Sequence, residues 1–93
     1  MKRVRFFISG KVHGVCYRFC SAKKAKELGV KGFVKNLPDG RVELVVEGEN
    51  NKVKDFITFC KNNPGHSKVE SLELGREEEV KIFLFKDFKI EYG

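Results

Sequence analysis

Residues 10–18 read Gly10-Lys11-Val12-His13-Gly14-Val15-Cys16-Tyr17-Arg18, a pattern that suits an anion site. Gly14 permits a tight backbone conformation in which neighbouring N–H groups point to one place. Arg18 adds a planar fork of donors that matches a phosphate group. This combination predicts the binding of one phosphate-sized anion. The same segment also fits an ordinary turn in which Arg18 caps a solvated helix start.

The neighbouring sequence places this segment between a strand and a helix. Before and within it, apolar residues alternate with polar ones, as in a half-buried strand: Val4, Phe6, Ile8 and Val12. After it, a helix over 18–28 is expected to close at Gly29. The residues predicted for its inner face recur every third position: Phe19, Ala22, Ala25 and Leu28. Because a helix start leaves N–H groups unpaired and carries a positive dipole, this junction favours an anion.

The rest of the chain predicts four or five further strands and a second helix. Alternation over 30–36 and 42–46, around the turn Leu37-Pro38-Asp39-Gly40, predicts a hairpin. Asn50 or Asn51 suits the N-cap of a second helix. Its apolar residues follow at helical spacing: Val53, Phe56, Ile57 and Cys60. Strands are expected over 68–75 and near 88–92. The apolar run 82–85 fits an additional strand, and 77–79 is interpreted as a solvated turn.

The order strand, helix, strand, strand, helix, strand predicts an α+β fold. It matches a ferredoxin-like α/β sandwich (βαββαβ), with an antiparallel sheet and two helices on one face. We expect a single domain over 1–93, because a chain of 93 residues supports one core. Enzymes, RNA binders, metal carriers and regulatory modules all use this architecture, so the fold does not by itself indicate a function.

The net charge of +6 is concentrated near the start of the chain. Residues 1–36 hold ten basic residues and one acid, or +9, whereas 37–93 hold nine and twelve, or −3. This favours an anionic partner, which could be a phosphate ligand, a nucleic acid or a membrane surface. No segment suits a signal peptide or a membrane span. The three cysteines, Cys16, Cys20 and Cys60, are too few for a disulfide framework, so we expect a cytoplasmic protein.

The segment 10–18 resembles the signature loop of the acylphosphatase family, Gly-x-Val-x-Gly-Val-x-Phe/Tyr-Arg. The matching residues are Gly10, Val12, Gly14, Val15, Tyr17 and Arg18. A second family signature follows at the expected distance: Leu28-Gly29-Val30-Lys31-Gly32-Phe33-Val34-Lys35-Asn36, then Asp39-Gly40 and Val42-Glu43. Residues 87–92 resemble the family's last strand. The chain departs from common family residues at His13, Cys16 and Phe33, which affects the expected substrate preference more than the reaction class.

The resemblance implies a metal-independent acylphosphatase that hydrolyses acyl phosphates such as acetyl phosphate or 1,3-bisphosphoglycerate to a carboxylate and inorganic phosphate. It implies that Arg18 and the loop amides bind the phosphoryl group and that Asn36 holds the attacking water. The implied phosphate-binding loop consists of His13, Gly14, Val15, Cys16, Tyr17 and Arg18. It also implies no cofactor, a small-molecule substrate, no nucleic acid or membrane partner, and a monomeric state.

Four other interpretations remain open. His13, Cys16 and Cys20 could bind zinc, although no fourth ligand lies near them in sequence. Cys16 could be a nucleophile beside Arg18, although such phosphatases need a longer Cys-x5-Arg loop to surround a phosphate. The basic first third and the aromatic residues also suit a non-catalytic RNA-binding or regulatory module. Finally, the chain could be a stand-alone relative of the acylphosphatase-like domain of carbamoyl-transfer maturation proteins.

Overall fold

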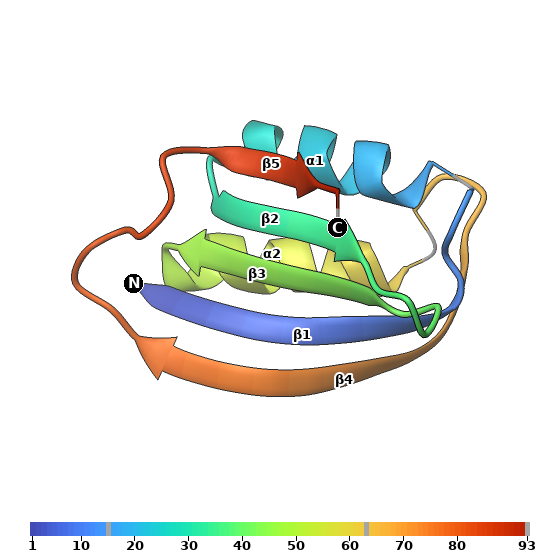
Figure 1. Cartoon of the computed structure of the whole chain (residues 1–93). Coiled ribbons are helices and arrows are strands. Elements are labelled where there is room, and N and C mark those ends of the chain that lie inside the picture. The colour runs from blue at the N-terminus through green and yellow to red at the C-terminus, as the bar shows by residue number, and fades with distance from the viewer. Residues whose placement is uncertain (15, 63, 93) are drawn as a thin grey trace.

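The computed structural model describes residues 1–14, 16–62 and 64–92, which form two helices and one five-stranded sheet (Figure 1). The elements in chain order are β1 (Lys2–Lys11), α1 (Tyr17–Leu28), β2 (Lys31–Asn36), β3 (Val42–Gly48), α2 (Asn50–Lys61), β4 (Lys68–Glu79) and β5 (Phe88–Glu91). The strand order in the sheet is β4-β1-β3-β2-β5. Both helices cover the same face of the sheet (Figure 1). The predicted ferredoxin-like sandwich is therefore confirmed.

The sheet is mixed, because its fifth strand is parallel to its neighbour. Strands β4, β1, β3 and β2 pair antiparallel in that order, whereas β5 runs parallel to β2, with Ile90 opposite Val34. The connection over 80–87 carries the chain from β4 at one edge of the sheet to β5 at the other (Figure 1). The strand expected near 88–92 is thus present as β5.

The apolar run 82–85 is not a strand, and it lies in the connection between β4 and β5. The Phe85 ring packs edge-on against Phe33 at 5.9 Å, and the Phe85 N–H donates to Glu47 Oε1 at 2.8 Å. Phe85 thus contacts β2 and β3 through its ring and one hydrogen bond, without forming a strand ladder. Ile82 and Leu84 remain 72% and 66% exposed.

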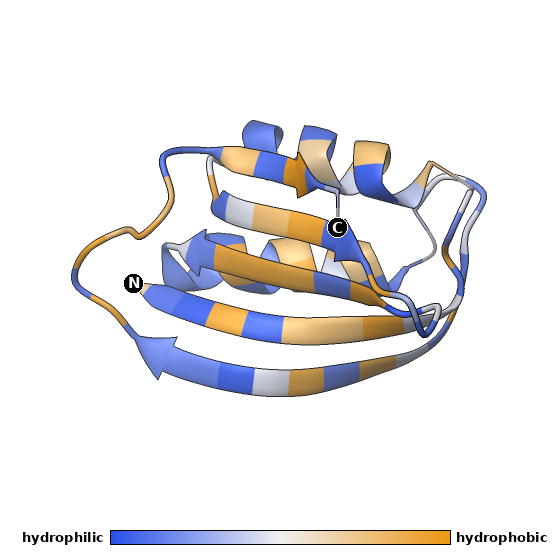
Figure 2. Ribbon diagram, in the orientation of Figure 1, coloured by the Kyte–Doolittle hydropathy of each residue, from blue (hydrophilic) through white to orange (hydrophobic). Residues whose placement is uncertain are grey.

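The expectation of a solvated turn at 77–79 is wrong, because β4 continues through Glu79. These residues pair with the start of β1, Glu79 opposite Lys2 and Glu78 opposite Arg3. Opposite charges on facing strands favour such pairing. Figure 2 shows the strongly hydrophilic end of β4 against this basic strand start. An acidic run is usually interpreted as solvated from sequence alone, but in this fold it pairs with the start of β1.

The core fills the space between the sheet and the two helices. β3 is hydrophobic along much of its length (Figure 2). Strand residues fully buried in this layer include Val4, Phe6, Ile8, Val42, Leu44 and Val46. From α2, Val53, Phe56 and Cys60 pack against them, as their spacing predicts. The helix begins at Asn50 with Glu49 as its N-cap, so neither Asn50 nor Asn51 caps it.

The prediction for the inner face of α1 is wrong at Phe19. The buried residues of α1 are Tyr17, Ser21, Ala22 and Ala25, while Phe19 is 64% exposed. Two positions along a helix rotate the side chain by roughly 200°, which turns Phe19 away when Tyr17 points inward. The predicted end is correct, since Gly29 is left-handed and its N–H bonds to Ala25 and Lys26. Neither described helix is long and apolar enough to cross a membrane.

Candidate active site

The predicted loop lies where four segments of the chain converge. β1 ends there and α1 begins there, and the carboxyl ends of β2 and β5 point to the same region (Figure 1). In the parallel pair, Lys35 lies opposite Glu91, so Asn36 and Tyr92 follow at adjacent strand ends. Asn36 shares its strand face with buried Val34, which packs under the helices. The topology therefore brings Asn36 and the start of α1 to one end of the sandwich.

The loop backbone is left-handed at Gly14, as expected, and also at Cys16, which carries a Cβ. Gly14 has φ 69° and Cys16 has φ 62°, both left-handed. Cys16 is the N-cap of α1 and makes no side-chain capping bond, and the first turn of α1 holds no acidic residue. Val15, also predicted to contribute to the loop, lies outside the described residues. Left-handed residues before a helix start let N–H groups converge on an anion.

Two side chains attach the loop to the rest of the fold. The Tyr17 hydroxyl donates to the carbonyl of Cys60, at the end of α2, at 2.8 Å. Burial raises the pKa of Tyr17 well above its ordinary range, so this donor stays protonated. On the other side, His13 Nε2 donates to the carbonyl of Arg41, in the turn between β2 and β3, at 3.2 Å. The loop is therefore held by the core and by the hairpin that carries Asn36.

Arg18 stands in the first turn of α1 without an acidic partner. Among the described residues, the other four arginines each pair with a carboxylate: Arg3 with Glu47 and Glu78, Arg5 with Glu43, Arg41 with Asp39 and Glu73, and Arg76 with Glu78. The Arg18 guanidinium instead lies over the Tyr92 ring, 5.0 Å from its centroid. Its charge is not neutralised by the described chain and is free to meet an anionic ligand.

Asn36 carries a buried acceptor that has no hydrogen-bond partner among the described residues. Its Oδ1 is inaccessible to solvent and unpaired, at the last residue of β2. Leaving a buried polar atom unpaired costs roughly 1–3 kcal/mol, so such atoms are uncommon away from functional sites. Together with Arg18, Asn36 supplies an unused acceptor and an unused cation at the same end of the sandwich.

The three cysteines have different surroundings. Cys16 is exposed at the loop, Cys20 is half-buried in α1, and Cys60 is buried beneath Tyr17. Burial raises the pKa of the Cys60 thiol to about 12, which keeps it neutral and unreactive. Cys16 precedes the helix in a left-handed conformation, so it does not share a helical face with Cys20. Among the described residues, no group of three His, Cys, Asp or Glu side chains is placed to hold a metal ion.

A shallow hollow of about 250 Å³ opens beside Arg18. Its lining includes Gly14, Cys16, Arg18, Phe19, Ile90 and Tyr92. Sites that enclose drug-sized ligands occupy roughly 300–1,000 Å³, so this open hollow suits a phosphoryl group whose substituent lies partly outside it. Phe19 and Tyr92 were missed as site residues. In the sequence Phe19 fits a helix core and Tyr92 fits only strand alternation.

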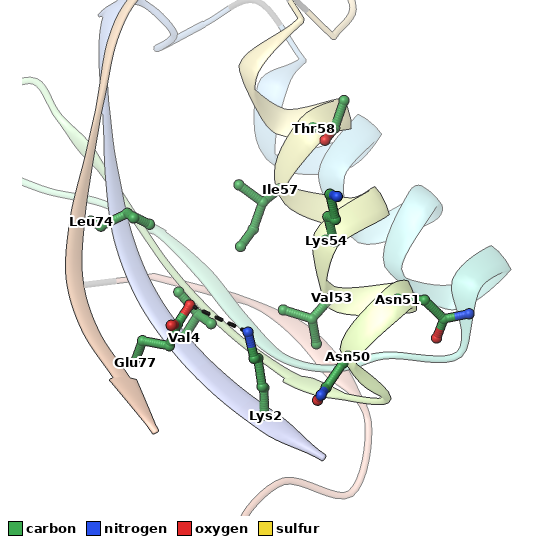
Figure 3. A pocket seen from close by; sticks show the side chains of 10 residues that line it. All are labelled: Lys2, Val4, Asn50, Asn51, Val53, Lys54, Ile57, Thr58, Leu74 and Glu77. Carbon is green, nitrogen blue, oxygen red and sulfur yellow. Dashed lines mark ion pairs between the residues drawn. The ribbon is translucent and has the colours of Figure 1, made fainter. Parts of the chain in front are cut away.

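A larger hollow of about 350 Å³ lies elsewhere, between α2 and β4 (Figure 3). Val53, Ile57 and Leu74 form much of its wall, and Lys2 is paired there with Glu77 at 3.8 Å. Its other polar lining residues are Asn50, Asn51, Lys54 and Thr58, and no arginine is among the described residues that line it. The larger volume alone does not make it the better candidate for chemistry.

Comparison with known proteins agrees with the geometry. The profile of the Acylphosphatase family matches residues 4–90. A curated acylphosphatase from Rubrobacter xylanophilus is 47% identical over 76 residues, covering 82% of this chain and 69% of that protein. The crystal structure of the Bacillus subtilis acylphosphatase superposes with a TM-score of 0.91 at 33% identity, covering 99% of this chain and all of that one.

The fold also matches a segment of a much longer protein. Full-length HypF, crystallised in a phosphate- and nucleotide-bound form, superposes with a TM-score of 0.78 at 32% identity. That match covers 98% of this chain but 12% of HypF. The family profile and the close relatives of similar length confirm the resemblance seen in residues 10–18 and 28–43. The chain belongs to the acylphosphatase family, a family of hydrolases.

Proposed function

We propose that this chain hydrolyses the carboxyl–phosphate anhydride bond of acyl phosphates, such as acetyl phosphate, to a carboxylate and inorganic phosphate. Membership of the acylphosphatase family supports the reaction class. The observation that carries the proposal for this chain is Arg18, an arginine at a helix start with no acidic partner among the described residues. Such a cation is available for a phosphoryl group.

In this proposal the loop and Arg18 bind the phosphoryl group together. The guanidinium contacts two phosphoryl oxygens, and the backbone amides of His13, Gly14, Val15, Cys16 and Tyr17 supply further donors. Phosphoryl transfer depends mainly on positioning and on stabilising charge spread over the phosphoryl oxygens. The left-handed Gly14 and Cys16 support the loop curvature that this requires.

Asn36 holds the nucleophilic water in the proposed mechanism. The Asn36 side-chain amide forms a hydrogen bond with the water and directs the water oxygen toward phosphorus. The new phosphorus–oxygen bond forms as the bond to the acyl oxygen breaks, and the carboxylate leaves with that electron pair. A phosphoryl oxygen of the substrate takes the proton from the water. A carboxylate is a good leaving group, so no separate protein base is required.

The proposal includes a metal-free enzyme that acts as a monomer in the cytoplasm without a nucleic acid partner. Arg18 and the amides provide the charge stabilisation that a metal would otherwise supply. The small hollow beside Arg18 also favours a small molecule over a polymer.

The test is release of inorganic phosphate from acetyl phosphate and benzoyl phosphate in the presence of EDTA. We expect turnover that EDTA does not reduce, and a monomer by size-exclusion chromatography. An Arg5→Met variant is the control, because Arg5 is paired with Glu43 on another surface and its loss should leave turnover unchanged. Absence of turnover, or turnover only with added metal, would overturn the proposal. Tight RNA binding at physiological salt without turnover would favour the RNA-binding interpretation.

A further inference from the structure

Two exposed aromatic side chains border the hollow beside Arg18. Phe19 is 64% exposed and Tyr92 is 79% exposed, and both line the hollow with Ile90. Large apolar side chains gathered on a surface often mark a contact with a ligand or partner. These two come from α1 and from the residue after β5, which the fold brings together at the loop. Their position beside an unpaired arginine favours a ligand with an anionic end and an apolar end.

The arrangement separates the hollow into two chemically different sides. Gly14, Cys16 and Arg18 offer backbone groups and a cation, while Phe19, Ile90 and Tyr92 offer apolar surface. The Arg18 guanidinium over the Tyr92 ring lies where these sides meet. A phosphoryl group held by Arg18 therefore has its substituent within reach of the aromatic rings.

We propose that Phe19 and Tyr92 form an acyl-group subsite that favours acyl phosphates with an aromatic or bulky apolar acyl group over acetyl phosphate. This rests on the proposed function and adds the substrate class to it. The rings shield the apolar acyl group from water, and an aromatic acyl group gains ring–ring contacts as well. An acetyl group offers the rings much less apolar surface than an aromatic acyl group does.

A second role for Tyr92 has to be separated from this one. Because its ring stacks under Arg18, its loss could disturb phosphate binding without any acyl contact. Arg18 lies over the ring of Tyr92. A Phe19 variant therefore tests the contact with the acyl group without removing the ring under Arg18. If Tyr92 acts only by positioning Arg18, Phe19→Ala should leave the affinity for inorganic phosphate unchanged, and Tyr92→Ala should lower it.

The test measures binding of two phosphonates that cannot be hydrolysed, benzoylphosphonate and acetylphosphonate, and of inorganic phosphate, by calorimetry. The variants are Phe19→Ala, Tyr92→Ala and Tyr92→Phe. Ile82→Ala is the matched control, because Ile82 is 72% exposed in the connection over 80–87, away from the hollow. Benzoylphosphonate should bind about tenfold more tightly than acetylphosphonate to the unmodified protein, and this ratio should fall about fivefold to tenfold in Phe19→Ala and Tyr92→Ala.

In Tyr92→Phe and Ile82→Ala the ratio should remain within twofold. A ratio near one in the unmodified protein, or a ratio insensitive to Phe19→Ala, would overturn the subsite. A loss of inorganic phosphate affinity in Tyr92→Ala with no change in Phe19→Ala would assign Tyr92 to Arg18 positioning and also overturn it. Because binding is measured without turnover, failure of the phosphate-release assay rejects the proposed hydrolysis, whereas these ratios decide the subsite separately.

Discussion

Arg3 and Arg18 lie at opposite ends of the sandwich, in contrasting surroundings. Arg3 is near the start of β1, where Nε donates to Glu47 at 2.9 Å and Nη1 donates to Glu78 at 3.1 Å. Although partial burial acts to lower it, hydrogen bonds to Glu47 and Glu78 hold the pKa of Arg3 above its ordinary value. Arg18, near the other end of β1, meets no carboxylate among the described residues and stacks on a ring.

The contrast shows how one residue type serves two purposes in a chain of this size. At the Arg3 end, the fully buried Glu47 carboxylate is satisfied by the guanidinium and by the N–H of Phe85. This network joins β1, β3, β4 and the 80–87 connection. At the Arg18 end, the Arg18 cation has no carboxylate partner and the Asn36 oxygen has no hydrogen-bond partner among the described residues. We infer that paired charges hold the structure, while unpaired ones are reserved for a ligand.

Arg18→Met is expected to have the largest effect, on activity alone. Removing the guanidinium takes away the main charge that stabilises the transferred phosphoryl group, so kcat/KM should fall at least about 10³-fold. The free energy of unfolding should change by less than about 0.5 kcal/mol, since no ion pair is lost. Phosphate release and urea unfolding on the same preparation measure both. A large fall in the free energy of unfolding would contradict the inference that Arg18, unlike Arg3, does not hold the structure together.

Arg3→Met should show the reverse behaviour. It leaves the buried Glu47 carboxylate without its cation, which should lower the free energy of unfolding by about 3–5 kcal/mol. The kcat/KM of the folded fraction should stay within twofold. Urea unfolding checks the first value. Adding Glu47→Gln removes the buried charge and should recover at least half of the loss; no recovery would mean that packing, rather than the ion pair, holds this end.

Asn36→Ala should lower kcat about 10²-fold while leaving inorganic phosphate affinity within twofold. The water loses its side-chain amide partner, whereas Arg18 and the loop amides that bind the phosphoryl group are unchanged. Because the variant also removes a buried unpaired oxygen, the free energy of unfolding should rise by about 1 kcal/mol. Steady-state kinetics and phosphate titration separate the two effects. Retained turnover would remove Asn36 from the mechanism.

Cys16→Gly should have the smallest effect and should stabilise the protein. Cys16 is the non-glycine residue with positive φ among the described positions, a conformation that costs roughly 1–2 kcal/mol for a residue with a Cβ. Glycine also makes the unfolded chain more flexible, which offsets part of this benefit. The free energy of unfolding should therefore rise by about 0.5–1 kcal/mol. Thermal unfolding measures it. Cys16→Ala keeps the Cβ and serves as the control; an equal gain there would show that the thiol, not the backbone, matters.

Local patterns predict most of the fold, because burial follows the periods of helix and strand. The spacing in α2 and the alternation in β1 and β3 correspond to buried faces. The expectations that failed depend on distant partners. Residues 77–79 extend β4 because they pair with the start of β1, and Phe85 contacts Phe33 and Glu47 instead of joining a strand. Single-segment patterns contain neither interaction.

The candidate site was predictable in part. Glycine, a helix start and Arg18 indicate an anion site from local chemistry alone, whereas Asn36 entered only through the family resemblance. Phe19 and Tyr92 were missed because their closeness depends on the orientation of α1 and the register of β5. The His13 bond to the Arg41 carbonyl likewise requires the folded hairpin. Register and helix rotation are set by tertiary packing, which one sequence does not contain.

The hydrogen bond from Tyr17 to the Cys60 carbonyl joins the first turn of α1 to the last turn of α2. Separation of the first turn of α1 from the core breaks this bond, so we expect the two turns to open together. Amide hydrogens in these turns should therefore exchange with deuterium through one common opening event, although more than forty residues separate them in the chain. An anion held at the loop would slow exchange at both places, so protection at the end of α2 would report occupancy of a site that it does not touch.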